Sequence, residues 1–97
     1  MTYLEGLAEQ VRLAVPSDAL PDDDTSGLFL IYAVLLLAKG EEVTREDVHN
    51  AWVAWMTGKG EEHESMVPFA NLPRHTQAED SAFVVAIRTV ARERTAG

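Results

Sequence analysis

Apolar residues along this chain recur at the three- and four-residue spacing of α-helices, in four separate segments. In residues 2–15, five apolar side chains fall on one helical face: Leu4, Leu7, Ala8, Val11 and Val15. Thr2 and Glu5 form a capping-box pattern at the start of this segment, and Pro16 is expected to end it. No segment shows the alternation of a half-buried strand, so the sequence predicts an all-α fold.

The second segment, residues 25–39, differs because it has no polar face. Every residue from Leu28 to Ala38 is apolar, and this run is too short for a bilayer, which needs about 20 residues. A helix of this kind has to be covered on every side. We expect the other helices to wrap it. The alternative is that one strip is left for a second subunit, which predicts a homodimer through this helix.

Two further helices are predicted in the C-terminal half. The third begins at Thr44, where Asp47 takes the place of the usual Glu of a capping box, and it ends near Gly58. A polar loop follows. Pro68 then predicts an extended Val-Pro-Phe elbow, because proline disfavours the helical conformation in the residue before it.

The fourth helix is expected to start at Pro73, which suits a first helical turn. A capping pattern of Thr76 and Glu79 is an alternative start three residues later. In both cases the helix runs to about Glu93. The prediction is therefore a compact four-helix domain with an extended elbow before its last helix.

Length and composition fit one globular domain over residues 1–97, with an N-terminal helical pair in residues 2–39. The 97 residues are 46% hydrophobic and 25% charged, as in ordinary folded proteins. The net charge of −8 argues against direct binding of nucleic acid, whose phosphates attract basic residues, and against an anionic membrane surface. The N-terminal residues lack the basic-then-apolar pattern of a signal peptide, so a cytoplasmic location is expected.

The sequence contains no recognisable catalytic or metal-binding motif. It has no cysteine, which excludes disulfides, thiol nucleophiles and cysteine-based zinc sites. The run from Asp22 to Gly27 resembles the start of a calcium-binding loop, but the position of its essential Glu is occupied by Ala33. The three histidines are too far apart in sequence for a helical zinc motif. We therefore expect a protein that is not an enzyme and has no metal or cofactor.

Candidate binding residues cluster in the C-terminal half. Trp52 and Trp55 are three residues apart and therefore neighbours on a helix. Each fills the core or lies at the rim of a pocket; we favour the core for Trp52. Asp80 is expected to accept a hydrogen bond from His49 or from the indole of Trp52. This contact is either a structural clamp between two helices or part of a small polar pocket that also includes His63.

The order of these residues resembles the RyR domain, the module repeated in ryanodine receptors and also found in bacterial and phage proteins. The resemblance covers residues 44–91, and its motifs are His49-Asn50-x-Trp52, His63, Met66-Val67-Pro68-Phe69, Leu72-Pro73 and Asp80. It implies a non-enzymatic binding or interaction module. The ligand- or partner-binding residues that it suggests are His49, Trp52, Trp55, His63, Phe69 and Asp80.

Two functional readings follow. By resemblance, the chain is a phage or actinobacterial accessory protein that binds a nucleotide-like small polar ligand or a protein partner. The alternative is an acidic homo-oligomeric interaction protein. One form of this reading is a DNA mimic directed at a host protein, which would present the carboxylates of Asp22–Asp24, Glu41–Glu42 and Glu61–Glu64.

Overall fold

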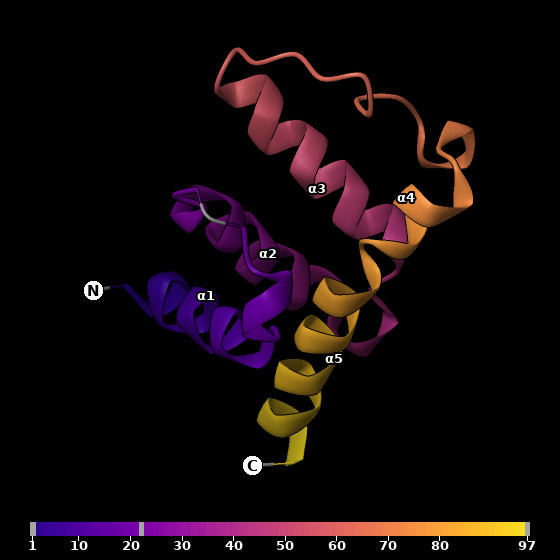
Figure 1. Cartoon of the computed structure of the whole chain (residues 1–97). Helices are drawn as coiled ribbons and strands as arrows, with labels where there is room; N and C mark the ends of the chain where they lie inside the picture. The colour runs from indigo at the N-terminus through magenta and orange to yellow at the C-terminus, as the bar shows by residue number, and fades with distance from the viewer. Residues whose placement is uncertain (1, 22, 97) are drawn as a thin grey trace.

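The computed structural model describes residues 2–21 and 23–96. Within these residues there is no strand, and the all-α prediction is confirmed (Figure 1). Three 3-10 turns connect the helices: Ser17–Ala19, Gly40–Glu42 and Phe69–Asn71. The α-helices are α1 (Tyr3–Ala14), α2 (Ser26–Lys39), α3 (Arg45–Gly58), α4 (Arg74–Ala78) and α5 (Ser81–Ala96).

Both predicted capping boxes are present. At the start of α1, the Thr2 hydroxyl accepts a hydrogen bond from the Glu5 backbone N–H, and the Glu5 carboxylate accepts one from the Thr2 N–H. At the start of α3, Thr44 and Asp47 make the same reciprocal pair, with distances of 2.9 and 3.2 Å. The shorter Asp side chain therefore serves as well as Glu here.

The hydrophobic core lies where α1, α2, α3 and α5 meet. Figure 1 shows α1 and α2 side by side, with α5 crossing near their ends and α3 beyond α2. The radius of gyration is 12.9 Å, which matches one globular unit, since about 13 Å is expected for 100 residues. The largest fully buried side chains are Val11, Tyr32, Leu36, Val43, Val48, Ile87 and Val90.

The apolar helix α2 is covered on only part of its surface. Leu28, Phe29, Tyr32, Ala33 and Leu36 are buried against the other helices. A strip on the opposite side stays open, with exposed fractions of 37% for Leu30, 53% for Val34 and 45% for Leu37. The expectation that neighbouring helices wrap α2 completely is therefore wrong for this strip. Four short helices do not supply enough surface to enclose it.

The predicted last helix is divided into α4 and α5, which point in different directions (Figure 1). The backbone N–H groups of Glu79 and Asp80 donate to the carbonyls three residues earlier, so the α-helical pattern stops there. The Gln77 side-chain amide donates to the carbonyl oxygens of Phe69 and Leu72, both at 3.1 Å, and ties α4 to the preceding turn. The prediction of one helix up to Glu93 was wrong because these contacts bind α4 to the elbow.

The elbow before α4 is extended at Pro68, with φ −54° and ψ 143°. It is shorter than predicted, because Phe69 already begins a 3-10 turn. The elbow is attached to α3 through His49, whose Nε2–H donates to the carbonyl oxygen of Val67 at 2.6 Å.

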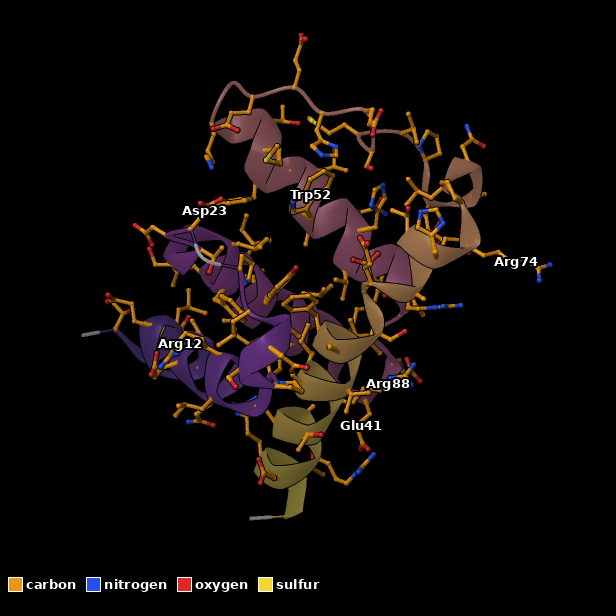
Figure 2. All side chains as sticks on the ribbon, viewed as in Figure 1. Arg12, Asp23, Glu41, Trp52, Arg74 and Arg88 are labelled. Atoms are coloured by element: carbon orange, nitrogen blue, oxygen red, sulfur yellow. The ribbon has the colours of Figure 1, made fainter. Side chains whose placement is uncertain are left out.

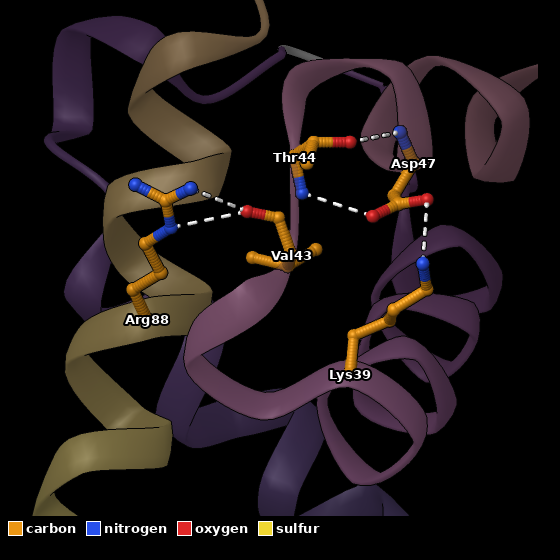
Figure 3. Close-up of polar contacts among 5 residues, drawn as sticks. All are labelled: Lys39, Val43, Thr44, Asp47 and Arg88. Carbon is orange, nitrogen blue, oxygen red and sulfur yellow. Dashed lines mark hydrogen bonds and ion pairs between the residues drawn. The ribbon is translucent and has the colours of Figure 1, made fainter.

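A second attachment joins α5 to the start of α3 (Figure 3). The Arg88 guanidinium donates two hydrogen bonds to the carbonyl oxygen of Val43, at 3.0 and 2.7 Å. Val43 directly precedes the capped Thr44, and Lys39 forms an ion pair of 3.6 Å with Asp47. The Arg88 contact therefore fixes the turn between α2 and α3 against the last helix.

Candidate functional site

A cleft of ≈ 750 Å³ lies between the start of α2, the length of α3 and the junction of α4 with α5. In Figure 2, the labelled Asp23 and Trp52 mark two of its walls: the connector before α2 and the face of α3. Its apolar lining comes from Leu28, Tyr32, Trp52, Trp55, Met56, Leu72 and Phe83. Its acidic lining comes from Asp23, Glu61, Glu79 and Asp80.

Trp52 lies in this cleft between two imidazole rings. Its ring stacks on that of His49, with centroids 5.9 Å apart and an interplanar angle of 30°. His63 meets it nearly at a right angle, at 5.4 Å. The Nδ1 atom of His63 accepts a hydrogen bond from the backbone N–H of Ser65 at 3.0 Å, which places its ring proton on Nε2. Trp52 is partly buried: it packs against the hydrophobic core, as we favoured, and also lines the cleft.

His49 is the buried imidazole of the site, with 3% of its surface exposed. Its Nε2–H donates to the carbonyl oxygen of Val67, and not to Asp80 as we predicted from the sequence. Phe69 packs against its ring at 6.0 Å, and the Arg45 guanidinium lies 5.9 Å from the centre of the Phe69 ring. Phe69 is not among the residues that line the cleft. It supports His49 from behind and does not face a ligand.

Asp80 is half-buried in the turn between α4 and α5. Burial raises the pKa of its carboxyl to about 6; nearby Glu79 adds to the rise, while His49 and Arg45 oppose it. No described cation lies within ion-pair distance of this carboxylate. Asp80 is therefore a partly desolvated acid without a countercharge in contact, which is costly unless something else pairs with it.

Tyr32 stands next to Asp80 on the floor of the cleft. Its side chain is 2% exposed, and burial together with the Asp80 charge raises the pKa of its phenol well above the usual value. The rings of Tyr32 and Phe83 lie 5.6 Å apart. Tyr32 and Phe83 therefore add aromatic surface to the cleft that Asp80 also lines.

At the other end of the cleft, Lys59 covers Trp55. The ammonium nitrogen lies 3.9 Å from the centre of the indole ring, a cation–π contact. The same nitrogen is 3.5 Å from the Glu61 carboxylate. Its charge also helps to lower the pKa of Asp24, although hydrogen bonds from Ser26 are the larger cause.

The two helices α2 and α3 approach each other closely at Gly27. A Cβ atom at this position would lie 3.2 Å from Nε1 of Trp55. The absence of a side chain at Gly27 therefore allows the indole to lie against the first turn of α2.

Five of the six predicted site residues thus line one cleft: His49, Trp52, Trp55, His63 and Asp80. Sequence reasoning missed Tyr32, Lys59, Glu79 and Phe83. Tyr32 carries the only polar atom in the side chains of the run from Leu28 to Ala38, and that was a usable signal. Lys59 gave no such signal, because it lies between two glycines that indicate the end of a helix.

The described residues contain no group of three or more His, Asp or Glu side chains placed to hold a metal ion. Asp22, from the calcium-loop pattern, lies outside the described residues, while Ala33 is fully buried in α2. No helix in the described part of the chain is long and apolar enough to cross a membrane.

Comparison with known proteins gives one match. The family model DUF7701, described as a domain of unknown function, matches residues 2–92. No curated protein and no solved structure matches the chain. The resemblance to the RyR domain was therefore wrong: the family that matches is a different one, and its match also includes α1 and α2.

Proposed function

The chain belongs to the DUF7701 family, and we propose that it is a non-enzymatic binding module whose cleft takes a small ligand. The observation that carries this proposal is the combination in one cleft of two tryptophans with the half-buried, unpaired Asp80 carboxylate. Ligand sites commonly join an apolar, aromatic lining to a few convergent polar groups. The volume of ≈ 750 Å³ lies in the usual range of such sites.

The hydrogen bonds of the histidines favour binding over catalysis. His49 uses Nε2 for the Val67 carbonyl, and His63 uses Nδ1 for a backbone N–H. Among the described residues, no serine or threonine hydroxyl forms a hydrogen bond with either imidazole. A nucleophile needs such a base within reach. The polar groups of the cleft are therefore suited to recognition.

Tryptophan fluorescence tests the proposal directly, because the only two tryptophans of the chain both line the cleft. The protein is titrated with a panel of nucleotides, amines and neutral aromatic compounds, and thermal shift is measured in parallel. We expect at least one class to change the emission and raise the melting temperature. Trp52→Phe should weaken the response while keeping the fold. Absence of both signals across all three classes would overturn the proposal.

We also propose that the exposed strip of α2 is covered by a second copy of the chain. Leu30, Val34 and Leu37 form one apolar line along this helix. The helix dipoles oppose each other when two such helices pair antiparallel, which favours this arrangement of the two copies.

A further inference from the structure

The acidic character of the cleft restricts what it can bind. Four carboxylates line it, against a single ammonium group from Lys59. The chain as a whole carries a net charge of −8, which adds to the negative potential at the mouth. A phosphate-bearing ligand would meet repulsion from most of the charged lining.

The cleft already holds one organic cation, supplied by the chain itself. The Lys59 ammonium rests on the face of Trp55 at 3.9 Å and touches the Glu61 carboxylate at 3.5 Å. An aromatic face combined with a carboxylate is a common way to bind alkylammonium groups. This contact shows that the geometry of the cleft suits such a group.

The region around Asp80 combines a carboxylate with aromatic side chains in a similar way. Its carboxylate is half-buried, has no cation in contact, and lies beside Tyr32 and Phe83. A cation that enters here replaces lost hydration with an ion pair in a partly desolvated place, where Coulombic attraction is stronger than at an open surface. The neighbouring rings provide an apolar surface for a hydrocarbon stem.

We propose that the cleft selects a small organic cation, an ammonium or guanidinium group on an apolar stem, with the charged group against Asp80. This inference rests on the proposed binding function and adds the chemical class of the ligand. It replaces the nucleotide-like ligand expected from sequence. A free amine and an arginine side chain of a peptide share this chemistry.

Proton and ligand compete for the same carboxylate, so the affinity for a cation rises between about pH 5 and pH 7. The titratable and charged groups around Asp80 are Glu79 in the same turn, His49 and Arg45 on α3, Tyr32 on α2 and His63 in the lining of the cleft. The part of this pH dependence that comes from Asp80 should be absent in Asp80→Asn.

The test uses agmatine, which carries both a guanidinium and an ammonium group on a four-carbon stem. Calorimetry and tryptophan fluorescence measure its binding to the wild type, to Asp80→Asn and to Glu93→Gln, a matched loss of one exposed carboxylate on α5. We expect Asp80→Asn to bind at least about tenfold more weakly, as for loss of a charge-assisted contact. Glu93→Gln should bind like the wild type. N-acetylarginine amide in parallel distinguishes a peptide source from a free amine.

The outcomes separate the inference from the proposed function. Binding of adenosine monophosphate or a neutral aromatic compound in the cleft, without binding of agmatine, overturns the cation class and leaves the binding module intact. Equal agmatine affinity of Asp80→Asn and the wild type overturns the assignment to Asp80. No response to any compound overturns the proposed function together with the inference. Circular dichroism of both variants establishes that they are folded.

Discussion

The Nε2–H of His49 donates a hydrogen bond of 2.6 Å to the carbonyl oxygen of Val67, 18 residues later in the chain. This contact holds the loop after α3 against the helix and orients the imidazole on which Trp52 stacks. His49 is also the one buried polar residue found in the described part of the chain. Its role is therefore to build the wall of the cleft.

Replacing His49 by Ala should destabilise the protein. The change leaves the Val67 carbonyl without its donor and opens a space behind Trp52. We expect a loss of about 2 kcal/mol in the free energy of unfolding, measured by urea denaturation. His63→Ala is the control, because His63 is exposed and should cost far less. Equal losses for the two variants would contradict the structural role of His49.

Asp80→Asn should stabilise the folded protein at pH 7. The folded-state pKa of about 6 lies above the unfolded value near 3.9, so the folded protein binds more protons between these two values. Stability therefore falls as the pH rises through this window. Because Asp80 is only half-buried, solvent screening reduces the gain from the variant to about 1 kcal/mol. Denaturation curves at pH 4, 5, 6 and 7 should show a flatter profile for Asp80→Asn, and an unchanged slope would contradict the prediction.

Arg88→Ala should weaken the connection between α5 and the turn before α3. The variant removes the two guanidinium N–H groups that donate to the carbonyl oxygen of the fully buried Val43 (Figure 3). We expect a loss of about 1–2 kcal/mol in unfolding free energy. Arg92→Ala is the matched control, because Arg92 forms only an exposed ion pair with Glu41, worth at most about 0.5 kcal/mol. Thermal melts of the two variants should therefore differ clearly, and a larger effect of Arg92→Ala would refute this account.

Val34→Glu should prevent self-association through α2. The variant places a charge in the middle of the exposed strip, where a second copy would bury it. Light scattering should show a dimer for the wild type and a monomer for the variant. Val85→Glu is the control, since Val85 is 61% exposed on α5, away from the strip. If the wild-type protein stays monomeric at millimolar concentration, the proposed dimer is wrong.

Gly27→Ala should disturb the cleft through Trp55. The added Cβ approaches Nε1 of the indole to 3.2 Å, so the ring has to shift by a few tenths of an ångström. We expect a change in tryptophan emission and weaker ligand binding. Gly6→Ala provides the comparison, because nothing lies within 4 Å of its added Cβ, and alanine favours a helix by up to about 1 kcal/mol. It should raise the melting temperature without a change in emission.

The sequence predicted the features that depend on neighbouring residues. The capping boxes at Thr2 and Thr44 were correct, as was the end of the second helix at residue 39, which Gly40 follows with φ +58°. Such features need only a few adjacent side chains. The break between α4 and α5 was not predicted, because the side chain of Gln77 binds carbonyls of a turn several residues away. Nothing in the helical periodicity of that segment indicates this contact.

The candidate site was found in part. His49, Trp52 and Asp80 line one cleft, and helical spacing accounts for the neighbouring positions of the first two, but the predicted hydrogen bond to Asp80 is replaced by one to Val67. Tyr32 was overlooked, since an all-apolar run gives no sign of which residue faces a cleft. The RyR resemblance was wrong because His, Trp, Pro and Leu-Pro also occur in this order in a chain that belongs to another family. Such residues serve packing and turns in many folds.

The ammonium of Lys59 lies on the indole of Trp55 at the mouth of the cleft, and it would compete with an external amine for this ring. Acetylation of this lysine would remove the positive charge, and with it the cation–π contact to Trp55 and the ion pair with Glu61. It would also make the surrounding charge more negative by one. The affinity of the cleft for an external amine would then depend on whether Lys59 is acetylated.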